Sequence, residues 1–340
     1  MECVQYISTN QYNIFLVKYE TKQHIILNQN PFIMKKNLRY FCLLLFAGTI
    51  LLQSCKKEVT NLPQQVGIFY SVVDKQAAFT ALTIQVDQWN WDFGDGTTSI
   101  EKNPVHVYSN GGYYTVTLTG KDASGKSAVA KSDIAVALTP YVLLTGGATN
   151  AKGKTWKLSG KHSPKDIFAQ ADADFTIVEG PLPSGVFGTL GMVEVYDDTY
   201  TFHFDGKYGH DVKADGAAFG GIVNQMIANG GAGIVNAAGK DFGLCTAKYT
   251  PQSGATFTYT EKEDLAVPSV YGPGGVLTYK GVGTLDFSGT EFIGFMDYQR
   301  KVIVQEITDN SMRLVMFMAA SPDYFPANTH ALILTFEVVK

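Results

Sequence analysis

Arginine is nearly absent from most of this 340-residue chain. After residue 54 only Arg300 and Arg313 remain. Removing the five basic and two acidic residues of positions 1–54 from the 27 and 31 of the whole chain leaves a net charge of −7. Nucleic acids and anionic lipid surfaces attract dense basic patches. The composition therefore argues against a nucleic-acid partner and against electrostatic docking on a membrane.

Long apolar runs are also missing. The longest, from Tyr40 to Leu52, has about 13 residues, whereas ~20 are needed to span a bilayer. It follows the basic start Met34-Lys35-Lys36-Asn37-Leu38-Arg39 and precedes small residues, a pattern typical of a cleaved secretory signal. We therefore expect residues 34–54 to be a signal peptide. Residues 1–33 show no periodicity and are interpreted as an upstream over-extension of the reading frame.

The end of this signal carries a recognisable motif, Leu52-Gln53-Ser54-Cys55. It resembles the lipobox of bacterial lipoproteins, and the following Lys56-Lys57-Glu58 resembles lipoproteins of Bacteroidota-type Gram-negative bacteria. The resemblance implies that Cys55 becomes a lipidated N-terminus and anchors the protein to the outer membrane, at the cell surface. The cell-surface face is the expected one, and the periplasmic face stays open as the alternative. Residues 55–65 are expected to form a tether.

Cysteine is scarce, with four in the chain. Cys3 and Cys42 lie before the cleavage point, and Cys55 would carry lipid. Cys245 then remains alone, which excludes an internal disulfide and a cysteine metal cluster in the mature protein.

The most specific pattern is an aromatic strand followed by a glycine turn. Trp89, Trp91 and Phe93 alternate on one strand face, where large rings fill a sandwich core. The turn Gly94-Asp95-Gly96 supplies residues that tolerate positive φ. Further on lie His106-Val107-Tyr108 and the strand-like stretch Tyr113 to Thr119.

Together these segments resemble the PKD domain, with its Trp-Asp-Phe-Gly-Asp-Gly signature. The resemblance covers residues 66–138 and implies a seven-stranded immunoglobulin-like sandwich that acts as a spacer or adhesive unit. His106 is expected to be structural. Asp92 and Asp95 could help to hold calcium, so calcium stays open as a cofactor and no other cofactor is expected.

The remainder of the chain predicts an all-β protein with a second, larger domain. Thr139-Pro140 marks a boundary, residues 139–154 read as a linker, and residues 155–340 as a β-sandwich of jelly-roll type. The expected strands are Thr155–Leu158, Gly191–Val195, Thr199–Phe204, Thr256–Glu261, Val276–Tyr279, Thr284–Phe287, Phe292–Phe295, Lys301–Thr308, Met312–Met318 and Leu332–Val338. Apolar residues at helical spacing within Ala217–Ala238 predict a short helix followed by a glycine-rich loop.

Three short segments suggest a role for this domain: Gly153–Leu158, Tyr196–Phe202 and Glu306–Leu314. They resemble a C-terminal domain of Bacteroidota lipoproteins that are encoded beside glycan-degrading enzymes. The resemblance implies noncatalytic binding of a polysaccharide, with neighbouring transporters or glycan-degrading proteins as partners.

Sugar rings stack on flat aromatic faces, and carboxylates or amides bond their hydroxyls. Aromatic residues in turn-rich segments are therefore the candidates for ligand contact. They are Tyr271, Tyr298, Tyr324 and Phe325, together with Tyr208 and His210, which follow a turn and could line a rim. Trp156 is a further candidate, although its place at the start of a strand favours the core.

Catalysis is not expected. Glycoside hydrolysis needs two carboxylates flanking one bond. Glu194 and Asp198 come nearest, but no second glutamate follows at positions 199–201, and Asp197-Asp198 reads as a turn. Three alternatives stay open beside glycan binding: a structural or adhesive surface protein, a glycoside hydrolase, and a lipocalin-like barrel for an apolar ligand. The last is suggested by the Gly153–Leu158 segment at the start of a β domain.

Overall fold

The computed structural model describes residues 63–340. The upstream stretch 1–33, the signal peptide 34–54, Cys55 and most of the tether lie outside the described residues, so their interpretations stay predictions. Residues 61–340 form one compact unit. Within the described part, no helix is long and apolar enough to cross a membrane.

The first domain consists of seven strands in two antiparallel sheets. One sheet has the order β1-β2-β5 and the other β4-β3-β6-β7. The strands are β1 (Gln65–Val73), β2 (Gln76–Ile84), β3 (Gln88–Asp92), β4 (Thr98–Ser99), β5 (Val105–Val107), β6 (Gly112–Lys121) and β7 (Ser127–Val136). This is the predicted seven-stranded sandwich.

Aromatic side chains fill this sandwich as the sequence predicts. Trp91 and Phe93 are buried, and the ring of Phe79 from β2 lies 5.4 Å from each of them, centroid to centroid. The Tyr108 hydroxyl donates a hydrogen bond to the Phe93 carbonyl at 3.1 Å. Because the two sheets share these rings, the aromatic alternation of β3 fixes which of its faces is buried.

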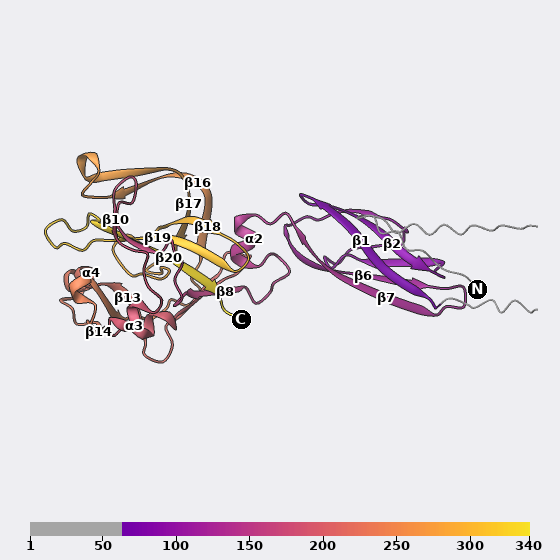
Figure 1. Ribbon diagram of the computed structural model, residues 1–340, viewed down its shortest axis with the longest axis horizontal. Helices are drawn as coiled ribbons and strands as arrows, with labels where there is room; N and C mark the ends of the chain where they lie inside the picture. Colours follow the sequence, from indigo (N-terminus) through magenta and orange to yellow (C-terminus); the bar gives the residue numbers. More distant parts are fainter. Residues whose placement is uncertain (1–62) are drawn as a thin grey trace, which may run out of the picture. The chain divides into compact units, whose positions relative to one another are not determined.

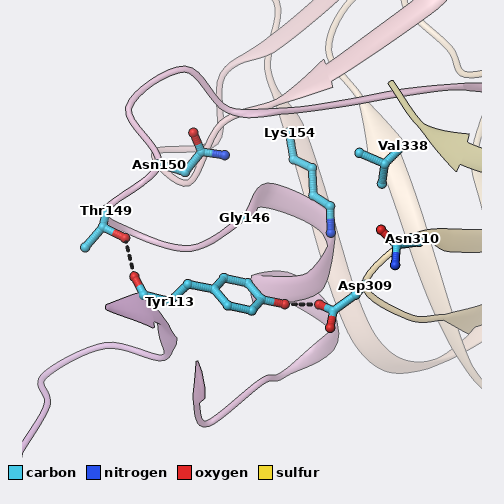
Figure 2. Close-up of a pocket in the computed structure, with 8 residues that line it drawn as sticks. All are labelled: Tyr113, Gly146, Thr149, Asn150, Lys154, Asp309, Asn310 and Val338. Atoms are coloured by element: carbon cyan, nitrogen blue, oxygen red, sulfur yellow. Dashed lines mark hydrogen bonds between the residues drawn. The ribbon is translucent and has the colours of Figure 1, made fainter. Parts of the chain in front are cut away.

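The predicted linker contains a short helix, α2 (Pro140–Thr145). The Thr139 hydroxyl accepts a hydrogen bond from the Val142 N–H, and proline suits the first helical turn because it lacks an N–H that would go unpaired. Pro140 therefore starts a helix here and does not only break a strand. Figure 2 shows the segment that follows, where the Thr149 hydroxyl donates to the Tyr113 carbonyl at 2.8 Å.

The larger domain is built on a sheet of ten strands. Its main path has the order β12-β11-β8-β20-β19-β18-β17-β16, and β9 joins β20 to β10. The strands of the domain are β8 (Lys154–Leu158), β9 (Ile167–Gln170), β10 (Ile177–Glu179), β11 (Thr199–Phe202), β12 (Tyr208–Asp211), β13 (Ala217–Gly221), β14 (Ile234–Asn236), β15 (Leu244–Lys248), β16 (Phe257–Pro268), β17 (Val276–Phe287), β18 (Val302–Ile307), β19 (Ser311–Met318) and β20 (His330–Val338). Figure 1 shows β18, β19 and β20 as neighbours.

This sheet curls until its two edges meet. Lys207 and Thr256 form an antiparallel bridge just before β12 and β16. Beside it the Tyr208 N–H donates to the Ala255 carbonyl at 2.9 Å, and the Phe257 N–H donates to the Gly206 carbonyl at 3.0 Å. Each strand on the path is antiparallel to its neighbours. The strand order is therefore that of a closed meander, as in the lipocalin-like alternative, and not that of a jelly roll.

Alternation along β20 shows how the closed sheet is packed. Leu332, Leu334 and Phe336 belong to the main core, whereas Ile333 belongs to a second core on the opposite face. Both faces of this strand are thus buried. The prediction of an all-β chain, with a PKD-like sandwich followed by a larger β domain, is confirmed.

Segments between the strands of the larger domain carry two short α-helices and three short 3-10 helices. They are α3 (Val186–Thr189), α4 (Ile222–Asn229), η1 (Val193–Tyr196), η2 (Lys240–Phe242) and η3 (Pro273–Gly275), in addition to α2 in the connector. The α4 helix confirms part of the helical prediction for Ala217–Ala238. Residues 217–221 are instead strand β13, which pairs with β15 and is completely buried.

Two predicted strands are wrong. Gly191–Val195 ends in the 3-10 helix η1, and Phe292–Phe295 is a buried irregular segment. Phe292 and Phe295 are both buried against other aromatic rings. A short apolar run predicts that the segment is buried, but it does not by itself distinguish a strand from a buried loop.

Candidate functional site

Three loops of the larger domain present exposed aromatic side chains. Tyr271 lies after β16 and is 43% exposed, Tyr298 lies before β18 and is 54% exposed, and Tyr324 lies between β19 and β20 and is 61% exposed. Phe325, next to Tyr324, is half-buried. We call these four residues the aromatic loop surface. All four were candidates from the sequence.

The structure brings two of these loops into direct contact. The rings of Tyr298 and Phe325 lie 5.4 Å apart, centroid to centroid, with an interplanar angle of 72°. This edge-to-face geometry is favourable because the positive edge of one ring meets the negative face of the other. The two rings are thereby held against one another, although they lie 27 positions apart in the chain.

Asn328 joins the loop of Tyr324 to the loop of Tyr271. Its backbone N–H and its side-chain amide both donate to the Pro268 carbonyl, at 2.9 and 2.7 Å. Its own carbonyl accepts from the Val270 N–H at 3.1 Å. Asn328 is fully buried. These three bonds fix the two loops side by side at the end of β16.

Asp297 holds the backbone of the loop that carries Tyr298. Its carboxyl oxygen Oδ1 accepts from the Tyr298 N–H at 2.7 Å, and the side chain is almost fully buried. Burial raises the pKa of Asp297 to about 7, against the opposing effect of the backbone N–H groups of Tyr298 and Ala319. Ala319 opens the loop that carries Tyr324. Asp297 therefore lies where two of the aromatic loops meet.

The aromatic loop surface has the features that carbohydrate recognition requires. Exposed tyrosine rings offer flat apolar faces, and their hydroxyls offer hydrogen bonds at the ring edge. Asp323, exposed beside Tyr324, adds a carboxylate acceptor for sugar hydroxyls. Because the loops are tied by Asn328 and Asp297, little conformational freedom would be lost on binding.

The role of Asp297 and Asn328 in positioning this surface was not predicted from the sequence. Asp297 and Asn328 carry no motif of their own. Each nevertheless adjoins a candidate aromatic segment, Asp297 directly before Tyr298 and Asn328 three residues after Phe325. A short polar side chain beside an exposed aromatic residue was the available signal, since such side chains commonly fix loop backbones.

Tyr208 and His210 do not line a rim, which corrects that expectation. Tyr208 is 5% exposed and its hydroxyl donates to the Phe292 carbonyl at 2.6 Å. The His210 side chain is fully buried, with Nδ1 3.2 Å from Oε2 of Glu291. Closure of the sheet at Lys207 and Thr256 covers this segment. The sequence correctly indicated a turn before Tyr208, but it did not indicate which segments pack over Tyr208 and His210.

Trp156 is a core residue and not a ligand contact. It is completely buried, and its ring N–H donates to the Leu144 carbonyl at 2.9 Å. The ammonium of Lys154 lies 4.8 Å from the centre of its ring. Burial lowers the pKa of Lys154 to about 8. The preference for the core in the sequence is therefore correct for this residue.

The two acidic residues considered for hydrolysis, Glu194 and Asp198, lie in different surroundings. Glu194 accepts hydrogen bonds from the Asn236 amide at 2.9 Å and the Thr246 hydroxyl at 3.3 Å. Asp198 is buried rather than exposed in a turn, and burial raises its pKa to about 8, with Asp215 adding to the effect. The two side chains thus have different surroundings, one bonded to neutral donors and one enclosed.

The acidic turn of the first domain uses its carboxylates internally. Oδ1 of Asp95 accepts from the Thr97 N–H and hydroxyl at 3.0 and 2.6 Å, and Oδ2 lies 2.7 Å from Nε2 of His106. The His106 ring stacks on Phe93 at 4.2 Å, so this histidine has a structural role. Among residues 63–340 no group of three or more histidine, cysteine or acidic side chains could hold a metal ion.

Comparison with known proteins identifies the first domain. The family model described as the PKD domain matches residues 71–136, so the chain contains a PKD domain. A curated relative, collagenase ColA of Bacillus cereus, is 36% identical over 90 residues, which are 25% of this chain and 9% of the collagenase. The chain thus spans about a tenth of that relative's length.

Solved structures give similar partial matches. The PKD1 domain of the Vibrio cholerae metalloprotease PrtV is 27% identical, with a TM-score of 0.22, and the match covers 23% of this chain and all of that domain. A structure described as carbohydrate-binding modules from the beta-sandwich superfamily is 14% identical, with a TM-score of 0.24 over 82% of this chain and 93% of the other.

Proposed function

We propose that the larger domain binds a polysaccharide without catalysis, through the aromatic loop surface. The observation that carries this proposal is the contact between Tyr298 and Phe325, which joins two loops beside the exposed ring of Tyr324. Loose surface aromatic residues would be unremarkable on their own. Three aromatic loops held together by buried Asn328 and Asp297 form a prepared binding surface.

The chemistry fits a neutral or hydroxyl-rich ligand. Stacking on tyrosine rings requires apolar C–H faces, and carboxylate and hydroxyl groups at the edge match sugar hydroxyls. An exposed surface of this kind suits a polymer chain that is contacted along its length. Such a surface gives affinity through several modest contacts.

The proposal extends to location. The lipobox-like Leu52-Gln53-Ser54-Cys55 would place a lipid on Cys55, and the PKD domain would stand between that anchor and the binding domain along the chain. The protein would then capture glycan at the outer membrane for neighbouring enzymes or transporters. Release of the protein from membranes on changing Cys55 to serine tests this part.

Affinity electrophoresis of residues 61–340 through gels containing plant, algal and host polysaccharides tests the binding. Retardation by one glycan is expected, with a loss of about tenfold or more in affinity for Tyr324→Ala, the size typical of a central aromatic contact. The matched control is Phe69→Ala, which removes a 60% exposed ring from the PKD domain. Equal retardation of the two variants would place the glycan elsewhere.

A further inference from the structure

An apolar cavity of about 300 Å³ opens in the larger domain, between the β9–β10 hairpin, α3 and η2. Its floor is formed by Phe187, Leu244 and Leu332, which are buried members of the main core. Half-buried Leu190 and the 53% exposed ring of Phe242 form its outer walls. Core residues at the floor make the cavity a fixed feature, because they cannot move without disturbing the main core.

The inner face of the closed sheet offers a contrast. Trp156, Phe202, Leu314 and Phe336 point into the main core and are fully buried. A lipocalin-like reading of the sequence would place an apolar ligand there, where these side chains already pack. The open apolar space lies instead between excursions from the meander.

The walls of the cavity are held by backbone hydrogen bonds from different parts of the chain. The Leu182 N–H donates to the Asp166 carbonyl at 2.8 Å, fixing the segment after β10. The Leu244 N–H donates to the Gly239 carbonyl at 3.1 Å, fixing the segment around η2. These hydrogen bonds hold both walls in place, so the space is largely preformed, as in most small-molecule sites.

We propose that this cavity binds a small apolar molecule with a neutral or positively charged head group. Its volume is about ten times the ~30 Å³ share of one water, which suits a body of about ten non-hydrogen atoms. Glu179 is the only charged side chain that lines the cavity, and it is exposed. A carboxylate ligand would meet like charge there, whereas an ammonium would meet an opposite charge.

Calorimetric titration of residues 61–340 with 1-naphthylmethylammonium and with 1-naphthoate tests the proposal. Residues 61–340 are suitable because they form a compact unit with their own cores. The ammonium probe is expected to bind and the carboxylate to bind at least several-fold more weakly. Methyl NMR should show shifts at Leu190 and Val186, which both line the cavity.

Two variants test separately the contribution of the apolar walls and that of the Glu179 charge to binding. Phe242→Ala should weaken the ammonium probe about tenfold by removing apolar contact, and Glu179→Gln should remove the preference over naphthoate. Tyr324→Ala should leave both titrations unchanged, since it belongs to the aromatic loop surface. The proposal is overturned if neither probe binds, if naphthoate binds more tightly, or if Phe242→Ala, with its fold verified by circular dichroism, binds the ammonium probe as the parent does.

Discussion

The carboxyl group of Asp297 occupies the space that a side chain at Gly221 would take. A methyl group placed on Gly221 would collide with Oδ2 of Asp297. Gly221 has φ −80°, so only this contact, and no backbone conformation, requires glycine here. The Asp297 carboxyl in turn holds the backbone of Tyr298, because it accepts a hydrogen bond from the Tyr298 N–H. A residue away from the aromatic loop surface thus leaves room for the carboxyl that holds the Tyr298 backbone.

Gly221→Ala is therefore expected to weaken glycan retardation several-fold while leaving the protein folded. The displaced carboxyl would move Tyr298 away from Phe325. Gly209→Ala is the matched control, because a methyl group there meets Thr201 at an ordinary 3.5 Å. Affinity electrophoresis compares the two. Unchanged retardation in Gly221→Ala would show that Tyr298 does not depend on this support.

Phe325→Leu tests the ring contact itself. Leucine keeps an apolar side chain but removes the aromatic face that meets Tyr298, so we expect weaker glycan binding and a loss of stability below about 1.5 kcal/mol. Urea unfolding and affinity electrophoresis measure the two effects on the same samples. Binding equal to that of the parent protein would contradict a role for the paired rings.

Asp198 makes stability depend on pH in a defined direction. With a folded-state pKa of about 8, against ~3.9 for an unfolded aspartate, the native state binds one more proton between these values. The free energy of unfolding should therefore fall as pH rises from about 4 to 8, by at most ~1.4 kcal/mol per pH unit. Asp198→Asn should flatten this slope in urea unfolding. The same slope in the variant would be the contrary result.

The stability of the folded protein should depend on the charge of Glu291, which is buried beside His210. Burial raises the pKa of Glu291, but hydrogen bonds from His210 and the Gln252 N–H outweigh it, and the pKa lies below its ordinary value. The stability that the pair contributes is therefore lost as pH falls through that lowered pKa.

Glu291→Gln is expected to cost about 1.5–3 kcal/mol in unfolding free energy, since it removes the charge that accepts hydrogen bonds from His210 and the Gln252 N–H in a buried site. Lys280→Ala serves as a control, because the Lys280–Asp264 pair is exposed and should contribute under ~1 kcal/mol. Similar losses of unfolding free energy in the two variants would mean that the buried pair contributes no more to stability than an exposed one.

Gly294 is expected to tolerate no side chain. Its φ is +70°, and a methyl group there would lie 2.7 Å from the Met316 sulfur and still closer to the Phe336 ring. Gly294→Ala should cost about 2–5 kcal/mol from backbone strain and overpacking together. Gly274→Ala isolates the strain, because φ is +67° there and nothing lies within 4 Å. Thermal and urea unfolding should separate the two variants.

The sequence predicted those parts of the molecule whose signals are local. The PKD sandwich follows from an aromatic alternation and a glycine turn, and Tyr271, Tyr298, Tyr324 and Phe325 were placed on loops because turn residues surround them. What the sequence could not provide was the ring contact between Tyr298 and Phe325, which depends on how two distant loops meet.

The wrong predictions for Tyr208, His210 and Asp198 share one physical reason. Tyr208 and His210 follow a turn, but the bridge from Lys207 to Thr256 joins segments 49 positions apart and covers them. Asp198 reads as a turn residue from its neighbour Asp197, and only packing shows that it is enclosed. Burial that arises from long-range closure leaves little trace in a short stretch of sequence.

The pairing of β8 with β20 also has a consequence for the time course of folding. Lys157 lies opposite Glu337, so the first strand of the closed sheet finds one of its neighbours only in the last. During synthesis, β8 must wait with an unpaired edge until almost the whole domain has been made. Contacts this distant in sequence slow folding and prolong the exposure of strand edges. Losing only the last ten residues would leave the nascent domain permanently at that stage.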